Sequence, residues 1–249
     1  MIKSVAAFVL LGWMTGCTAP EATASEPAAR APEAVEPTAD ADPQARALAE
    51  SVLERMGGAE AWRRTRYLTW TFFGRRRHMW DRHAGRARIE ADGDVYVIDL
   101  ETKEGRAWSG GEEVLEPEAL AEAMQRAHGM WVNDSYWMFM PYKLLDPGVV
   151  LRFAGAGELQ DGRPCQLLEM TFDGVGNTPD NRYTVAVADD TGLVEEWSFF
   201  AEADQLEPGF TLPWSGWKPF GAILLATDHG RGMDWAIEVP QTLPEELFR

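Results

Sequence analysis

The residues of this chain that could bind a metal ion are its four histidines and scattered acidic side chains. His78 and His83 bracket Asp81, but their odd spacing sends them to opposite faces of a strand. No histidine pair has the i, i+4 spacing of a helical zinc site. The oxygen-rich run 173–181 lacks the ligand spacing of an EF-hand loop, so we predict a long hairpin turn there. We therefore expect no metal and no cofactor.

Side chains that could act as nucleophiles are few. Asn133, Asp134 and Ser135 could form a nucleophile with helpers, but no histidine is placed as a base, and the three residues suit an N-cap better. Cys165 has no neighbouring histidine to lower its pKa and is expected to be a small buried residue. The paired acids 195–196 point to different faces of a strand, unlike the facing carboxylates of a glycosidase. We therefore predict that the protein is not an enzyme.

Arginines are concentrated between Arg63 and Arg88. They could form an anion-binding face, since guanidinium groups match carboxylate and phosphate. The alternative, which we favour, is cross-strand pairing with acids on the following strands. These acids are Glu90, Asp92, Asp94, Asp99 and Glu101. The formal net charge of -17 argues against nucleic acid and against direct attraction to anionic lipid surfaces.

The first 43 residues are predicted to be an export signal and a tether. Residues 1–16 have a basic start at Lys3, an apolar run too short to span a bilayer, and small residues before Cys17. The ending MTGC resembles the lipobox of bacterial lipoproteins, which implies that Cys17 is lipidated. Thr18 at the next position implies an outer-membrane anchor. Residues 17–43 are rich in Ala, Pro and Glu and are expected to be disordered, with a reach of roughly 80 Å when extended.

Residues 44–249 are expected to form a single domain, because no second linker interrupts them. Asp42-Pro43 begins a helix well and Gly57-Gly58 ends it. After Trp62 the apolar period changes to two, with short strands separated by glycines. The strands are predicted at 67–73, 75–81, 87–91, 95–100, 105–108, 149–154, 165–172, 182–188, 194–201, 220–228 and 235–239. A helix is predicted at 117–127.

A second helix is expected in the aromatic run 131–147, WVNDSYWMFMPYKLLDP. Its large apolar side chains cover more than half of its circumference, so it cannot lie on the surface with one face in water. It either plugs a concave sheet or lines a hydrophobic pocket. In the loop LPWSGWKPFG, Trp214 and Trp217 either pack at the sheet edge or cover an apolar cavity.

These elements predict an α+β fold with a curled antiparallel sheet, a half-barrel of about ten or eleven strands, and helices on its concave side. The layout resembles the LolA/LolB-like half-barrel of bacterial lipoprotein carriers and receptors. The tracts TWTFFGRRRHMWDRHAGRARIE, WVNDSYWMFMPYKLLDPGV and DDTGLVEEW also resemble a family of uncharacterised bacterial outer-membrane lipoproteins, from Leu53 to about Leu247. Neither resemblance brings an assigned binding residue with it.

We therefore expect a membrane-tethered, periplasm-facing lipoprotein of the outer membrane, a monomer, that binds a hydrophobic ligand such as a lipid or an acylated partner. The alternative is a cell-envelope carbohydrate-binding or structural module. Trp70, Phe72 and Trp80 share strand parity, which favours one face if the strand continues through Gly74. The residues expected to face the ligand are Trp70, Phe72, Trp80, Trp137, Met138, Met140, Trp214 and Trp217.

Overall fold

A computed structural model describes residues 42–176, 178, 180–230, 232 and 234–249. The predicted signal peptide, Cys17 and the tether up to residue 41 lie outside the described residues. The helices are α1 (Pro43–Arg55), α2 (Gly58–Arg64), α3 (Pro117–Phe139) and the 3-10 turns η1 (Met140–Tyr142) and η2 (Glu245–Phe248). The strands are β1 (Tyr67–Phe72), β2 (Arg76–Asp81), β3 (Arg86–Ala91), β4 (Asp94–Asp99), β5 (Gly105–Ser109), β6 (Glu112–Glu113), β7 (Val149–Glu158), β8 (Pro164–Phe172), β9 (Arg182–Ala188), β10 (Val194–Phe200), β11 (Phe210–Pro213), β12 (Lys218–Phe220) and β13 (Ile223–Leu225).

The first helix begins where the sequence predicts. The Asp42 carboxylate accepts hydrogen bonds from the amides of Gln44 and Ala45, and Pro43 occupies the first helical position, where its missing N–H costs nothing. The second carboxylate oxygen of Asp42 accepts a hydrogen bond from the Phe153 amide at 2.8 Å. This cap therefore also fixes the start of α1 to strand β7.

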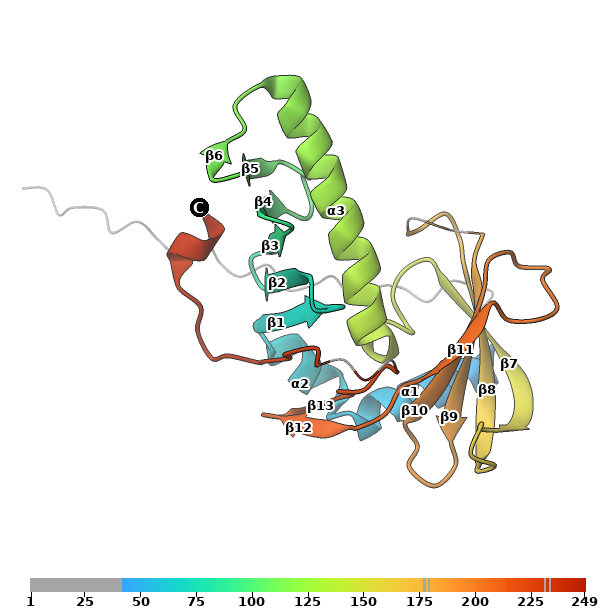
Figure 1. The fold of residues 1–249 in the computed structure, drawn as a ribbon. Helices are drawn as coiled ribbons and strands as arrows, with labels where there is room; N and C mark the ends of the chain where they lie inside the picture. The colour runs from blue at the N-terminus through green and yellow to red at the C-terminus, as the bar shows by residue number, and fades with distance from the viewer. Residues whose placement is uncertain (1–41, 177, 179, 231, 233) are drawn as a thin grey trace, which may run out of the picture.

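The strands divide between separate antiparallel sheets (Figure 1). Sheet A contains β1 to β6 in sequence order, sheet B has the order β11-β10-β9-β8-β7, and β12 pairs with β13. The α+β class and the antiparallel meanders are confirmed. The single sheet of ten or eleven strands is not found among the described residues. Helix α3, with 23 residues and a length of about 35 Å, separates β6 from β7, and the strands β7 to β11 that follow it pair with one another instead of extending sheet A.

Helix α3 is one continuous helix where the sequence predicts two. Glu116 caps it by accepting from the amides of Glu118 and Ala119. Gly129 lies inside it and lowers helix propensity by about 1 kcal/mol without ending the helix. Asn133, Asp134 and Ser135 therefore occupy the helix interior, and their prediction as an N-cap is wrong.

The two halves of α3 pack in different places (Figure 1). The N-terminal half places Ala123, Met124 and Ala127 against the face of sheet A that carries Ile89 and Ile98. The C-terminal half enters the main core, which also takes side chains from α1, β1 and sheet B. The helix thus joins the two sheets through their apolar faces, as its large apolar circumference requires.

Beyond β10 the predicted strands differ most from the structure. The expected strand 220–228 is a small hairpin of β12 and β13, while β11 was not predicted. The expected strand 235–239 forms only an isolated bridge between Thr69 and Glu238, with amide–carbonyl bonds of 3.0 and 2.9 Å. Further along, Phe248 packs on Met79 and Val97 on the outer face of sheet A. None of the described helices is long and apolar enough to cross a bilayer.

Candidate functional site

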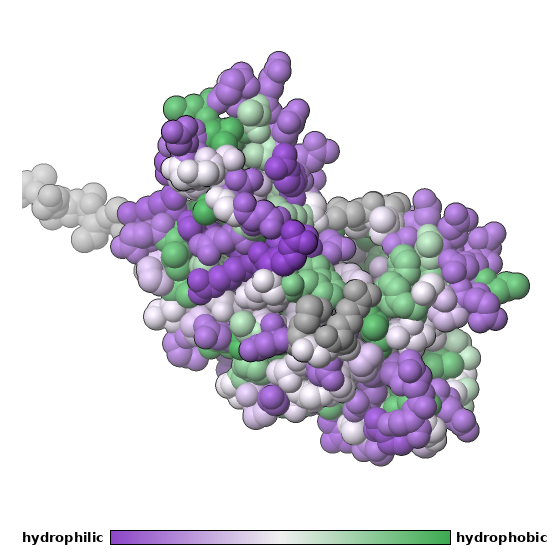
Figure 2. Space-filling model, in the orientation of Figure 1, coloured by the Kyte–Doolittle hydropathy of each residue, from purple (hydrophilic) through white to green (hydrophobic). Residues whose placement is uncertain are grey.

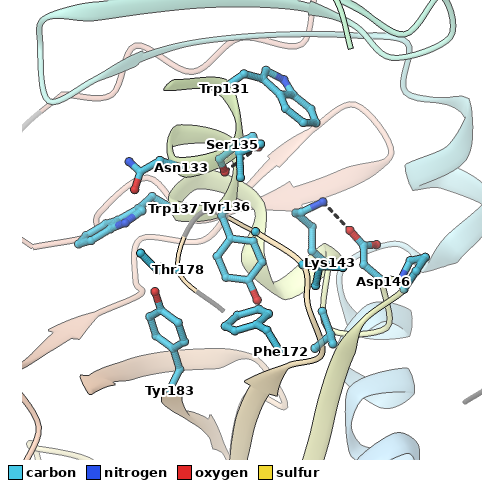
Figure 3. A pocket seen from close by; sticks show the side chains of 15 residues that line it. Trp131, Asn133, Ser135, Tyr136, Trp137, Lys143, Asp146, Phe172, Thr178 and Tyr183 are labelled. Carbon is cyan, nitrogen blue, oxygen red and sulfur yellow. Dashed lines mark hydrogen bonds and ion pairs between the residues drawn. The ribbon is translucent and has the colours of Figure 1, made fainter. Parts of the chain in front are cut away.

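A half-open cavity of about 240 Å³ lies beside the C-terminal half of α3 (Figure 3). We call it the aromatic cavity. Its walls come from α3, the turn between η1 and β7, the end of β8, the following loop and the start of β9. The lining residues are Trp131, Val132, Asn133, Ser135, Tyr136, Trp137, Lys143, Asp146, Pro147, Val149, Phe172, Val175, Gly176, Thr178 and Tyr183.

Three rings from three different elements form the floor of this cavity. Tyr136 of α3 lies 5.6 Å from Phe172 and 6.3 Å from Tyr183 between ring centroids, and the last two rings are 5.8 Å apart. The Tyr136 hydroxyl lies 3.0 Å from the Met170 sulfur. Burial raises the pKa of this hydroxyl well above 10.0, because the anion would lose its hydration. The floor is therefore neutral at any physiological pH.

Charge in the cavity wall is confined to one side. Among the described lining residues only Lys143 and Asp146 carry charge, and they form an ion pair with each other (Figure 3). The turn that holds them is tight, since the Asp146 amide donates to the Lys143 carbonyl at 3.1 Å and the Val149 amide donates to that of Asp146 at 3.1 Å. The backbone that carries the pair is thus fixed at the start of β7.

The loop after β8 packs against Gly148, at the end of the turn that holds the ion pair. Gly148 has a φ of +77°, and a Cβ at that position would lie 2.5 Å from the Val175 side chain. This close approach requires glycine.

The only exposed large hydrophobic residues in the described chain are Leu115, Val175 and Leu206. The visible surface is mainly hydrophilic, with smaller apolar areas around its middle (Figure 2).

Behind the cavity, a buried polar network ties α3 to strand β2. Both oxygens of Asp134 accept bonds of 2.7 Å from the Arg76 guanidinium, and Oδ2 also accepts from His78 Nε2 at 2.7 Å. Asn133, whose side chain lies at the cavity edge, donates to Oδ1 at 2.8 Å. Asp134 and His78 have no exposed side-chain surface. The network therefore fixes the rotation of α3, and with it the side of the helix that faces the cavity.

The pKa values within this network have separate causes. Burial raises the pKa of Asp134, but hydrogen bonds from His78 and Arg76 outweigh burial, so the pKa lies below 3.8. Burial lowers the pKa of His78 below 6.5, against the opposing effect of Asp134. A neutral His78 must donate its Nε2–H to the carboxylate, because a carboxylate only accepts. The ring also stacks on Trp70, with centroids 4.5 Å apart.

Only one of the eight residues expected to face a ligand, Trp137, lines the aromatic cavity. The strand does not continue through Gly74 as the sequence argument required, but Trp70, Phe72 and Trp80 still share one face, because the hairpin register pairs Trp70 with His78 and Leu68 with Trp80. Trp80 is partly buried against the main core. Five of the eight are buried within that core. They are Trp70, Phe72, Met138, Met140 and Trp214.

Trp217 does not reach the cavity either. It is partly buried, and its indole N–H donates to the Val194 carbonyl at 3.0 Å. Conversely, sequence reasoning missed Phe172, Tyr183 and Lys143. The first two carry a usable signal, because strands β8 and β9 alternate and place large rings toward one face. The cavity itself depends on how the loop after β8 folds back, which local pattern does not encode.

The arginine cluster forms ion pairs, as we expected, but mostly with other partners. Of the predicted acids, Asp92 pairs with Arg75, while Glu90 pairs with Arg88 along strand β3 and not across strands. The buried Asp81 instead pairs with Arg66 and Arg86, and Arg86 also pairs with Glu245.

The predicted burial of Cys165 is confirmed, and burial raises the pKa of its thiol. No group of three acidic, histidine or cysteine side chains among the described residues is arranged to hold a metal ion.

The described chain thus has an α+β fold with two large antiparallel sheets, a small two-stranded sheet, a helix between the two large sheets and a half-open aromatic cavity. No family model and no curated sequence matches it. Among solved structures it is similar to a DUF1329 family protein from Desulfovibrio piger, with 14% identity, a TM-score of 0.44, and coverage of 82% of this chain and 97% of that one. It is also similar to MucB, with 16% identity, a TM-score of 0.27, and coverage of 84% and 63%. The match to the Pseudomonas aeruginosa MucA/MucB complex has 22% identity and a TM-score of 0.25, and covers 64% of this chain and 53% of that one.

Proposed function

We propose that this protein is a membrane-tethered, periplasm-facing lipoprotein that binds a hydrophobic ligand, a lipid or an acylated partner, in the aromatic cavity. The observation that carries the proposal is the cavity itself, a hollow with a floor of three neutral rings and further walls from Val132 and Val149. Apolar ligand surface placed there leaves water, at a gain of about 25 cal/mol per Å².

The cavity volume limits what it can enclose. Ligand pockets for drug-sized molecules measure roughly 300–1,000 Å³, and the aromatic cavity is smaller at about 240 Å³. It would take a segment of an acyl chain or one apolar group of a partner, with the rest of the ligand outside. A partly enclosed ligand also suits the open side of the cavity.

The proposed location rests on the sequence that precedes the domain. The basic and apolar residues before Cys17 have the form of an export signal, and the lipobox-like ending supplies a lipidation site. The Ala/Pro/Glu tract up to residue 43 would then allow the domain to move within reach of the membrane without lying on it. This arrangement suits a protein that collects or presents apolar molecules near a bilayer.

A carbohydrate is the second candidate, favoured by a specific feature of the rim. Trp131 and Trp137 are partly exposed at the cavity, and Asp146 lies across from them. Sugars stack on such rings and donate hydroxyls to carboxylates. An enzymatic role has less support, because His78 and Asp134, the pair most like a base and its orienting acid, are fully buried.

Two adjacent valines on β7 provide the test. Val149 lines the cavity, whereas Val150 does not, because neighbouring strand residues point to opposite faces. Val149→Trp should fill the cavity and abolish binding of a fluorescent fatty acid, while Val150→Trp should bind like the wild type. Thermal melts of both variants would verify folding. All titrations are done in detergent-free buffer. If the wild type binds the fatty acid and Val149→Trp binds it equally well, the proposal is contradicted. If the wild type binds a soluble oligosaccharide and no fatty acid, the second candidate is favoured.

A further inference from the structure

The ion pair between Lys143 and Asp146 lies between the aromatic cavity and solvent. The Lys143 side chain is 22% exposed and that of Asp146 is 41% exposed. On the other side of the pair the lining is largely apolar, from Tyr136 to Phe172 and Val149. The cavity therefore has an apolar interior and a charged rim, which is the distribution of polarity along an amphipathic molecule.

The pair is of a kind that a ligand can displace. Partly exposed ion pairs contribute little to stability, because water solvates both charges almost as well. Asp146 is the more exposed partner and can turn into solvent. Lys143 is the less exposed partner, and its backbone is held by the bond from its amide to the Met140 carbonyl at 2.8 Å. Lys143 would thus remain at the rim as a donor without an acceptor.

From this geometry, and on the basis of the proposed function, we propose that the cavity takes an amphipathic anion. Its carboxylate or phosphate head group replaces Asp146 as the acceptor of the Lys143 ammonium, and its chain lies on the rings of Tyr136, Phe172 and Tyr183. The Tyr136 hydroxyl faces the Met170 sulfur and does not compete for the head group. Asp146 then acts as an internal competitor that sets how strongly an anion binds.

This arrangement predicts opposite effects for the two members of the pair. Lys143→Met removes the donor and should lower octanoate affinity about tenfold, to that of octanol, while octanol affinity stays unchanged. Asp146→Asn keeps the shape, removes the competing charge and should raise octanoate affinity several-fold. Lys218→Met, at an exposed lysine of β12, is the control for losing one positive charge from the acidic protein.

The experiment is calorimetric titration of the full protein and these variants with octanoate, octyl phosphate, octanol and octylammonium, with thermal melts to verify folding. The proposal is supported if the wild type binds octanoate or octyl phosphate more tightly than octanol and only Lys143→Met loses this preference. The anion that binds more tightly then identifies the head group. Equal affinity for octanol and octanoate would overturn it and leave the proposed function standing. Tightest binding of octylammonium, lost in Asp146→Asn, would also overturn it. If none of the four ligands binds, the proposed function fails as well.

Discussion

Replacing Asp134 with Asn should be among the most destabilising single-atom changes in this protein. The carboxylate accepts four hydrogen bonds, two from Arg76 and one each from His78 and Asn133. An amide in its place has one acceptor oxygen, so its NH₂ group must face at least one guanidinium N–H of Arg76. Removing one partner of a buried pair costs about 3–5 kcal/mol. Because the Arg76 side chain is 31% exposed and stays partly hydrated, we expect about 3 kcal/mol, the low end.

The measurement is urea unfolding followed by tryptophan fluorescence, accompanied by a thermal melt. For a domain of this size, about 3 kcal/mol corresponds to a melting temperature lower by about 6–12 °C. Asp92→Asn is the matched control, since Asp92 also pairs with an arginine, Arg75, but with both side chains at least 70% exposed. It should change the free energy of unfolding by well under 1 kcal/mol. Equal effects for the two variants would refute the reasoning that burial makes the Asp134 network strong.

The effect of Asp134→Asn should also depend on pH in a defined direction. In the folded protein the pKa of Asp134 lies below 3.8, because hydrogen bonds from His78 and Arg76 outweigh the effect of burial. The unfolded chain therefore takes up the proton first as pH falls. The stabilisation is fully present above about pH 4 and is lost as pH falls through the lowered pKa. The unfolding free energies of wild type and variant should converge there, and a constant difference down to pH 2 would contradict the assignment.

Three further predictions concern other parts of the chain. Burial between Trp214 and Trp235 lowers the pKa of His229 from 6.5 to about 4, so the wild type should lose about 3 kcal/mol of stability as pH falls across that window, and His229→Phe should lose correspondingly less in parallel unfolding titrations. Met140→Ala should cost about 2–5 kcal/mol in unfolding experiments, because the side chain is fully buried, yet leave fatty-acid affinity unchanged in the folded variant. Trp137→Ala should weaken that binding, and equal affinities for the two variants would count against the cavity. Cys17→Ser should move the protein from the membrane to the soluble fraction, and unchanged fractionation would remove the anchor.

Much of the local structure could be predicted from the sequence, because each strand carries its own evidence. The alternation and the glycine turns place β1 and β2 within one residue of their ends, whereas the shared face of Trp70 and Trp80 depends on the register of the hairpin between these strands. The division into three separate sheets could not be predicted. Apolar patterns show which face of a strand is buried. They do not show whether a strand that follows a long helix such as α3 joins the earlier sheet or begins a new one.

The candidate site was harder to predict because its parts are distant in sequence. Asp134 looks like a cap when read locally, and its partners lie 58 and 56 residues earlier, on β2. The aromatic run was rightly singled out, since Trp137 and Tyr136 both line the cavity. Which of its side chains face a hollow and which face the core depends on the rotation of α3, and that rotation is set by the Asp134 network.

The bridge between Thr69 and Glu238 has a consequence for the order in which the protein folds. The two residues are 169 positions apart, and the Thr71 amide likewise donates a hydrogen bond to the distant Trp235 carbonyl, at 2.7 Å. Contacts at such sequence separation slow folding, because a long loop must close before they form. Until the segment from Trp235 to Glu238 docks, the edge of β1 therefore has amides without acceptors, and an open edge of this kind invites pairing with other chains. A chain truncated before Trp235 should accordingly aggregate more readily than the full chain.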